Sequence, residues 1–374
     1  MRQVAISCLT HDRTKFFSAL AGVTFATLLV LAQVGIYAGF LEGASAVIRH
    51  VGGDVWLMAR GTPVIEFGEP VAAGTPMAVL SHPCVERVRP LVFAWVPMRR
   101  STGEFDSLQV IGTEARSGPL IPWSLREGLP SDLEPPLRAA VDESDLGKLG
   151  LPASPIGASL QVADKIIHIA AVTTGIRGFT LQPYMFTTIA TARRLAGFAE
   201  GRSTYLVIDL KDPSCARDVM ALAERRPDIE ARTTDDFAKI TETYWITGSG
   251  AGAVLGFSAL LGLVVGVVIV GQTLYSMTKD HQRELATLKA MGASNLELSS
   301  FVAWQAVLLA LVGGAIGTIL VFGLRRLLAG AGLRLVLSPP VLVLGYAAIV
   351  LMCSIASIGS VRKVLSFEAG EVFK

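Results

Sequence analysis

Three acidic side chains gather in one short stretch of the chain. Asp142, Glu143 and Asp145 lie close together, and paired carboxylates can act as a general acid and a general base. No histidine or serine motif accompanies them, so we interpret the stretch as a solvated turn. His168 stands alone in an alternating, strand-like segment, which predicts a partly exposed strand residue without a catalytic role.

The sequence also lacks nucleotide and metal motifs. The stretch DLGKLG (145–150) has no glycine at 142 and no serine or threonine after Lys148, so it is not a phosphate-binding loop. The five histidines and four cysteines show no CxxC or HxxxH spacing. We therefore expect no catalytic residue, no metal site and no directly bound cofactor, and we do not expect the chain alone to be an enzyme.

The most informative chemistry lies in residues 276–297, between two apolar stretches. Leu285, Leu288 and Met291 recur every three residues, as in a helix with a narrow apolar stripe. Gly292 predicts the end of that helix, and Ser294-Asn295-Leu296-Glu297 has the spacing of a capping box that starts the next one. A connection needs only a few residues, so we favour a docking surface. A solvated connecting hairpin is the alternative.

Four apolar stretches must position this segment. They are 16–40, 251–275, 298–323 and 340–360, and none contains Asp, Glu, Lys or Arg. Each is long enough to cross a bilayer as a helix, which takes about 20 residues. The mean hydropathy of +0.52 and the 51% of hydrophobic residues agree with a membrane protein. The first stretch is too long for a cleavable signal peptide.

Basic residues flank these stretches unevenly. Arginines and lysines in 1–15, 276–297 and 361–374 place these three segments in the cytoplasm by the positive-inside rule. We expect an amphipathic N-terminal segment at 1–15, a cytoplasmic helix at 276–297 and a cytoplasmic tail at 361–374, with both termini inside. The short outer loop 324–339 also carries arginines, against the rule, but the balance still favours this orientation.

Residues 41–250 are then extracytoplasmic. Two flanks, 45–112 and 203–246, alternate strand-like and helix-like segments, and the second flank ends in a helix that runs into the second span. The residues between them, 114–200, are rich in strand patterns and include a hairpin at 156–176. The predicted fold class is an α-helical membrane protein with four transmembrane helices and a large extracytoplasmic α+β domain, whose split halves surround an inserted β-rich lobe.

One cysteine lies in each flank of this outer domain, Cys84 in the first and Cys215 in the second. A disulfide between them would join the halves in an oxidising compartment. Two unpaired cysteines placed by chance are the alternative.

A family resemblance is carried by the charged segment and by the tail. HQRELATLKAMGAS (281–294) resembles the RREIGILRAIGAS signature of the FtsX-like, or MacB-like type VII, ABC transporter permeases. VRKVLSFEAGEVFK (361–374) and DRTKFFSALAGVTFATLLVLAQVGIY (12–37) resemble the DevC-like branch of that family. The layout of spans and porter-like halves extends the resemblance to essentially the whole chain. Ala369 and Gln305 depart from the family pattern, which usually has proline and often glutamate there.

The resemblance implies that 276–297 is a coupling helix seated in a separate ATP-binding subunit. Its contacts would come from charged side chains, an apolar stripe and the glycine of the turn: Arg283, Glu284, Leu285, Leu288, Lys289, Met291 and Gly292. ATP and Mg would be bound by that partner, because this chain has neither a Walker A motif nor an LSGGQ signature.

Glycines four residues apart concern helix packing. Gly252 and Gly256 form one such pair in and near the second span, and Gly262 and Gly266 form another. This spacing lets backbones approach closely in a membrane. Packing within one chain and contact with a second copy explain it equally well. Because four spans are few for a transporter, we expect a homodimer.

The implied function is that of a permease subunit in the bacterial inner membrane. ATP-driven closure of the ATPase would move the periplasmic domain (mechanotransmission) and drive export of an amphiphilic or periplasmic substrate with a periplasmic adaptor protein. The uncharged spans agree, since charges within a membrane usually mark a substrate path. The alternatives are a lipoprotein-releasing permease and an FtsX-like regulator of a cell-wall hydrolase without cargo. A net charge of +2 without a basic block favours no nucleic-acid partner.

Overall fold

The computed structural model describes residues 13–71, 79–100, 103–114, 122–176, 178, 182–248, 250–330 and 335–365. Most of the predicted N-terminal segment and of the predicted tail, including Ala369, lies outside these residues. The chain divides into two compact units, residues 1–39 with 251–374 and residues 40–250, which are described in turn.

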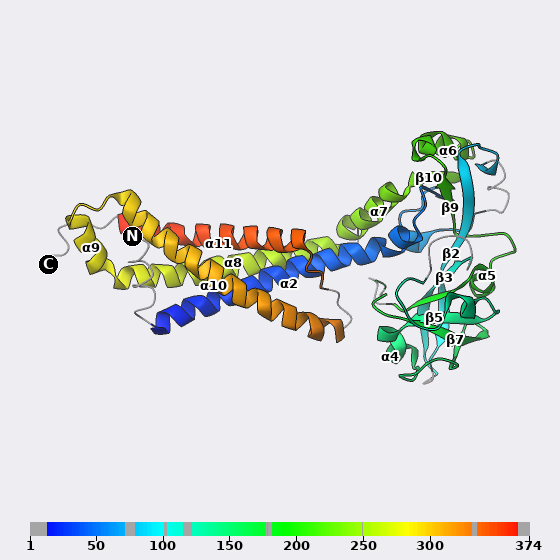
Figure 1. Ribbon diagram of the computed structural model, residues 1–374, viewed down its shortest axis with the longest axis horizontal. Helices are drawn as coiled ribbons and strands as arrows, with labels where there is room; N and C mark the ends of the chain where they lie inside the picture. The colour runs from blue at the N-terminus through cyan, green and yellow to red at the C-terminus, as the bar shows by residue number, and fades with distance from the viewer. Residues whose placement is uncertain are drawn as a thin grey trace. The chain divides into compact units, whose positions relative to one another are not determined.

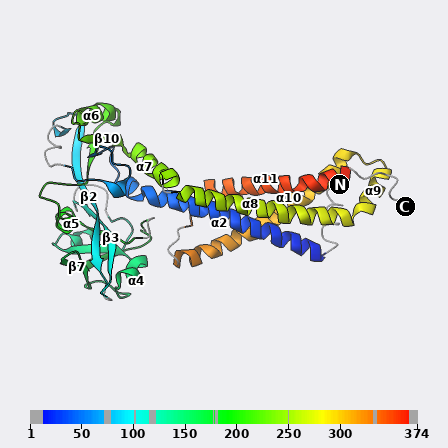
Figure 2. The ribbon, with the colours of Figure 1, turned by 180° about the vertical axis from the view of Figure 1, so that it is seen from behind.

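Within the described residues, the first unit contains four helices long and apolar enough to cross a membrane. They are α2 (Arg13–Val51), whose first part belongs here, α8 (Ala251–Asp280), α10 (Asn295–Gly330) and α11 (Pro339–Leu365). The short helix α9 (Gln282–Ala290) lies between α8 and α10 in the chain (Figures 1 and 2). Both α2 and α10 continue beyond the apolar runs that mark them in the sequence.

Small side chains let these helices pack closely. A Cβ atom added to Gly266 of α8 would lie 2.2 Å from Met352 Sδ and 2.8 Å from Ala26 Cβ. Gly262 is buried as well, whereas a Cβ on Gly256 would meet nothing within 4 Å. Packing within the chain therefore accounts for the second pair of glycines, and Gly256 lies on a face that the described chain leaves open.

The interior of this helical unit is apolar. Its buried polar side chains, among the residues described, are the uncharged Thr27, Thr278, Gln305 and Ser360. The buried Gln305 leaves its Oε1 without a hydrogen-bond partner. None of these buried side chains in the described part of the helices carries a charge.

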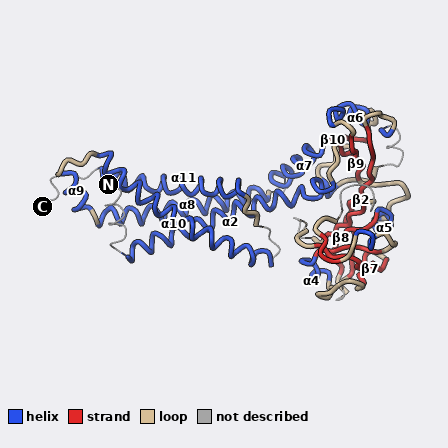
Figure 3. Tube along the Cα trace, viewed as in Figure 1, coloured by secondary structure: helices blue, strands red, loops and turns tan. Residues whose placement is uncertain are grey.

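The second unit is a mixed α/β domain built on one ten-stranded sheet (Figure 3). Its strands are β1 (Val55–Ala59), β2 (Val85–Arg99), β3 (Phe105–Thr113), β4 (Leu125–Glu127), β5 (Arg138–Asp142), β6 (Ser159–Val162), β7 (Lys165–Thr173), β8 (Tyr184–Thr188), β9 (Tyr205–Leu210) and β10 (Ile229–Thr233). Its helices are α4 (Leu146–Leu149), α5 (Ile189–Ala196), α6 (Ala216–Ala223) and α7 (Thr234–Thr243), after the C-terminal part of α2. Shorter helical turns are η1 (Ile65–Phe67), η2 (Pro130–Leu133), η3 (Glu143–Asp145), η4 (Pro213–Cys215) and the π-helical η5 (Tyr244–Gly248).

The long strand β2 belongs to two parts of this sheet. Its first half, up to Leu91, pairs with β9, so that one half-domain has the strand order β10-β1-β9-β2. Its second half, from Val92, pairs with β3. The pairings then continue through β8, β5, β7 and β6, and β6 returns to β2 at Met98 and Arg99. The ring of pairings closes, and apolar side chains such as Val96, Leu108 and Ile167 form its core.

This closed ring corrects the predicted lobe boundary. The prediction assigns β3 to the first flank and starts the lobe at 114, but the structure pairs β3 with β8 inside the ring. The lobe therefore begins within β2, because an alternating strand pattern does not tell which neighbour a strand pairs with. The predicted hairpin at 156–176 is present as β6 and β7.

Two further predictions concern single features of the domain. In the structure Cys84 and Cys215 form a disulfide with a Cα–Cα distance of 6.4 Å, and it ties the start of β2 to the start of α6. The helix after β10 does not run on into the second span. It changes to the π-helical η5, and Gly250 has a φ of +75° before α8 begins.

Candidate functional site

The segment between α8 and α10 is a short helix bounded by two local motifs. At the end of α9, the amide of Ala293 donates to the carbonyl of Leu288 at 3.0 Å and that of Gly292 donates to Lys289 at 3.1 Å. This is a Schellman motif, which requires a residue with positive φ, and Gly292 has a φ of +100°. The predicted role of Gly292 as a helix stop therefore has a local physical cause.

A capping box starts α10, as predicted. The amide of Ser294 donates to Glu297 Oε2 at 2.8 Å, and the amide of Glu297 donates to Ser294 Oγ at 3.3 Å. These two bonds satisfy amides at the helix start that lack a partner within the helix. The sequence gives no sign of a second break at His281, which separates α8 from α9.

One face of α9 is buried against the other helices of the chain. Leu285 is 2% exposed and packs in a cluster with Leu298 and Val302 of α10. Leu288 is half-buried against the same cluster. This corrects the expectation that Leu285 fills a groove in a partner protein, because its side chain is already buried against other helices of this chain.

The opposite face of α9 and its turn remain accessible. Arg283 and Glu284 are exposed, Met291 is 72% exposed, and Leu296 in the first turn of α10 is 83% exposed. Lys289 has a different use, since its Nζ donates to the backbone oxygen of Leu365, the last described residue of α11, at 3.2 Å. The surface offered by α9 is therefore a mixed apolar and charged patch that is braced on α10 and α11.

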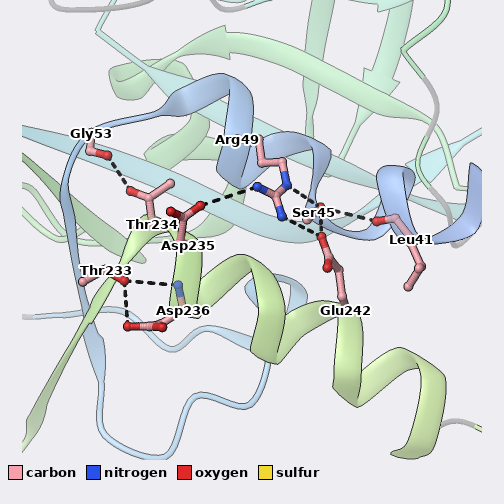
Figure 4. A network of polar contacts seen from close by, with 9 residues as sticks. All are labelled: Leu41, Ser45, Arg49, Gly53, Thr233, Thr234, Asp235, Asp236 and Glu242. Atoms are coloured by element: carbon pink, nitrogen blue, oxygen red, sulfur yellow. Dashed lines mark hydrogen bonds and ion pairs between the residues drawn. The ribbon is translucent and has the colours of Figure 1, made fainter. Parts of the chain in front are cut away.

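In the outer domain, a network of polar contacts joins the end of α2 to α7 (Figure 4). Glu242 of α7 accepts hydrogen bonds from Ser45 Oγ at 2.6 Å and from Arg49 Nη2 at 3.0 Å. Arg49 also lies 3.6 Å from Asp235, two turns earlier on α7. Because one guanidinium reaches two carboxylates seven residues apart, α7 is held alongside the end of α2. We call Ser45, Arg49, Asp235 and Glu242 the clamp.

A buried arginine fixes the last carbonyl of α2. Arg89 of β2 forms a bidentate pair with Asp209 of β9, at 2.8 and 2.7 Å. Its two Nη atoms also donate to the carbonyl of Val51, at 3.1 and 3.2 Å. A buried guanidinium that makes these four hydrogen bonds satisfies a helix C-terminus inside the domain. We call Arg89, Asp209 and the Val51 carbonyl the anchor.

Apolar side chains at the end of α2 complete the attachment. Val47, Ile48 and Val51 are at most 2% exposed, and they share one core with Phe237 of α7 and Phe186 of the strand ring. The last turns of α2 thus contact both parts of the outer domain. Sequence reasoning missed the clamp and the anchor. The one available signal was Asp209, the only charged residue in the apolar strand segment STYLVIDL.

The acidic stretch at 142–145 is not the solvated turn that the sequence suggested. Asp142 is fully buried and accepts hydrogen bonds from Ser144, from Thr173 Oγ1 at 3.0 Å and from the amide of Ile176 at 2.8 Å. It holds two loops together and is a structural residue. His168 lies exposed on β7 beside Ser159, at 3.0 Å. Among the described residues, no three His, Cys, Asp or Glu side chains are placed to hold a metal.

Comparison with known proteins assigns the family. Residues 256–369 match the FtsX-like permease C-terminal model, and residues 16–226 match the MacB-like periplasmic core domain. The second match covers more than half of the chain, so this protein belongs to the MacB/FtsX family of ABC transporter permeases. It is a multi-pass membrane protein with an extracytoplasmic domain, and the predicted fold class is confirmed. An ABC permease implies a partner ATP-binding subunit.

Particular relatives agree with this assignment. Uncharacterized ABC transporter permeases of Mycobacterium tuberculosis (strain H37Rv) and Mycobacterium bovis are 25% identical over 308 residues, which is 80% of this chain and 78% of theirs. Among solved structures, the periplasmic region of MacB from Actinobacillus actinomycetemcomitans is 11% identical, with a TM-score of 0.38 over 52% of this chain and 95% of that chain. The extracellular domain of the noncanonic ABC-type transporter YknZ from Gram-positive bacteria is 11% identical, with a TM-score of 0.36 over 48% of this chain and 98% of that chain.

Proposed function

We propose that this permease works by mechanotransmission. ATP-driven closure of the ATP-binding subunit moves α9, the helices carry the movement, and the outer domain changes position and drives export of an amphiphilic or periplasmic substrate. The observation that carries this proposal is the attachment of α2, a helix without an internal break whose end is held by the anchor and by the apolar core of the outer domain. The uncharged interior of the helical unit supports a mechanism in which the substrate does not cross between the spans.

The ATPase-coupling surface is the exposed face of α9 and its turn. Arg283, Glu284 and Met291 contact the partner, and Leu296 joins them although the sequence did not single it out. Leu285, Leu288 and Lys289 brace α9 on its neighbours, and Gly292 allows the turn. ATP and Mg are bound by the partner subunit alone.

The remaining assignments follow from the family resemblance. The protein lies in a bacterial inner membrane with both termini in the cytoplasm, and it belongs to the DevC-like branch, which works with a periplasmic adaptor. A second copy covers the open face of α8 at Gly252 and Gly256, where Val254 and Phe257 are 66% and 62% exposed. An apolar face of this kind suits either lipid or another helix. The two glycines four residues apart favour another helix, because they let two backbones approach closely.

The test measures docking and ATPase activity together. The full chain with Glu284→Lys and Met291→Asp is purified with its ATP-binding subunit in lipid nanodiscs. Because the double variant reverses one exposed charge and places another where an apolar contact is expected, we expect co-purification and permease-dependent ATPase activity to fall at least about tenfold, which corresponds to about 1.4 kcal/mol of binding free energy.

The matched control is Leu129→Asp, which places the same charge on a side chain that is 63% exposed in the outer domain. It should leave both readings at the wild-type level. An inserted double variant that binds and stimulates the ATPase normally would show that α9 is only a connector.

A further inference from the structure

A buried carboxylic acid lies beside the connection from the outer domain to α8. Glu66 of η1 is 3% exposed, its Oε2 accepts a hydrogen bond from Trp245 Nε1 at 3.3 Å, and its Oε1 has no hydrogen-bond partner. Trp245 belongs to η5, the last described helical turn before Gly250 and α8. Glu66 and Trp245 therefore join the body of the domain to the segment that leads into the second span.

The surroundings hold η1 firmly and η5 loosely. Trp95 Nε1 donates to the backbone oxygen of Glu66 at 3.1 Å, and Tyr205 OH donates to that of Ile65 at 2.8 Å, so η1 is fixed to strands β2 and β9. No residue of η5 is buried. Its aromatic side chains instead rest on Phe67, with ring centroids 6.5 Å away for Tyr244 and 6.2 Å for Trp245.

The electrostatic surroundings disfavour a charge on Glu66. The carboxylate of Glu66 acts on the phenols of Tyr184 on β8 and Tyr205 on β9, where it raises their pKa values. Asp145 also raises the pKa of Tyr184, and Arg232 of β10 lowers that of Tyr205. Burial raises the pKa of Tyr184 and of Tyr205 well above its usual range, so both phenols stay neutral. No ion pair involves Glu66 in the described part of the chain. Burial therefore raises the pKa of Glu66 from 4.5 to about 7, with hydrogen bonds from its own backbone and from Trp245 as smaller, opposing causes.

We propose that the contact between Glu66 and Trp245 is a proton-operated joint on the connection to the second span. With Glu66 protonated, η5 stays packed on η1; with Glu66 ionised, the packed arrangement is disfavoured and η5 is released. The π-helical geometry of η5 agrees with this role, since such turns occur frequently at functional sites. The inference deepens the proposed function only in that a released η5 would change how the outer domain follows α8.

The direction of the pH effect follows from the two states. Release exposes Glu66 to water, where its pKa returns towards 4.5. The packed state is therefore favoured fully below about pH 4.5, and it loses this advantage as the pH rises through about 7. Between pH 5.5 and 8.5 the ratio of packed to released η5 should fall about 30-fold.

Hydrogen exchange of the full chain in lipid nanodiscs tests the joint without any ATPase. Peptides that cover 240–250 are followed at pH 5.5 and 8.5 in the wild type, in Glu66→Gln and in Glu69→Gln. Variants are compared at the same pH, because chemical exchange itself depends on pH. Glu66→Gln keeps the shape of the protonated acid, so the wild type should be about 10-fold less protected than this variant at pH 5.5 and about 300-fold less protected at pH 8.5.

Glu69→Gln is the matched control, since it is the same substitution on an exposed residue three positions away, and it should behave as the wild type. An equal pH response in Glu66→Gln, or no response in the wild type, would overturn the proposal.

A second variant keeps the test decisive if Glu66→Gln does not fold. Trp245→Phe keeps an aromatic ring and removes the donor that stabilises the ionised acid in the packed state, so the ratio of packed to released η5 should fall more than about 30-fold between pH 5.5 and 8.5. A fall no larger than that of the wild type contradicts the joint. Because neither measurement uses ATP, a chain that responds to pH but fails to stimulate the ATPase would refute mechanotransmission alone.

Discussion

The two connections between the spans and the outer domain are built on opposite principles. α2 stays helical to Val51, and its last turns are buried among apolar side chains and held by Arg89. α7 instead changes to the π-helical η5, in which no residue is buried, and Gly250 has a positive φ before α8 begins. One connection is a fixed attachment, and the other has the features of a hinge.

Under the proposed mechanism, this difference would decide how movement reaches the outer domain. A domain that moves as a body needs one attachment that does not yield and one short segment that absorbs changes in φ and ψ. The anchor would fill the first role with a buried, hydrogen-bonded charge. Residues 244–248 would fill the second, because their side chains are exposed or half-buried. The clamp precedes the hinge in the chain, because it ties α2 to α7 before residue 244.

Breaking the anchor should have the largest effect. Arg89→Met leaves Asp209 and the Val51 carbonyl without their buried cation, so the free energy of unfolding of the outer domain should fall by about 3–5 kcal/mol. Chemical unfolding of the full chain measures this loss, with proteolysis of the outer domain used to monitor unfolding.

Arg87 provides the control for the anchor. It also pairs with Asp209, at 3.3 Å, but its side chain is 43% exposed. Arg87→Met should therefore cost less than about 1 kcal/mol. If both variants lost the same unfolding free energy, the burial of Arg89 would not make its pair with Asp209 stronger than the exposed pair of Arg87.

How much of this the sequence could foretell depends on the range of each interaction. The stop at Gly292 and the box at Ser294 are set by residues within five positions, and both were predicted correctly. The contact between Arg49 and Glu242 joins residues 193 positions apart, and no local pattern announces it. A sequence that lacked either Arg49 or Glu242 would show the same helical pattern in α2 and α7.

Predictions of which side chains are buried fail for the same reason. The apolar stripe on α9 was predicted, but not that Leu285 would be covered by Leu298 and Val302 of the next helix. Asp142 looks like a turn residue until Thr173 and Ile176 are brought to it by the pairing of β5 with β7. In each case the residue type was known and its neighbour was not.

Loosening the clamp should have an intermediate effect. Glu242→Gln keeps the shape of the side chain but weakens its bonds to Ser45 and Arg49, so we expect a loss of about 1 kcal/mol in unfolding free energy. A double-mutant cycle with Arg49→Gln should show a coupling energy of about 0.5–1 kcal/mol.

Asp235 is the internal comparison for the clamp, because its side chain is 78% exposed and lies 3.6 Å from Arg49. Asp235→Asn should change stability by less than about 0.5 kcal/mol. If the cycle between Arg49 and Glu242 shows no coupling, the two helices are held together by apolar contacts alone, and the clamp has no part in transmission.

Stiffening the hinge should change stability no more than loosening the clamp does, and it should change coupling most. Gly250 has a φ of +75°, and a Cβ there would meet nothing within 4 Å, so Gly250→Ala carries only the backbone cost of about 1 kcal/mol. Gly61→Ala has the same cost for the same reason, with a φ of +84° and open space, but it lies in the turn after β1. Permease-dependent ATPase activity and protection of η5 should therefore change in Gly250→Ala and stay at the wild-type level in Gly61→Ala. If the two variants lose equal stability and both keep wild-type coupling, the positive φ at Gly250 is a local turn, and the contrast between a fixed and a yielding connection fails at that residue.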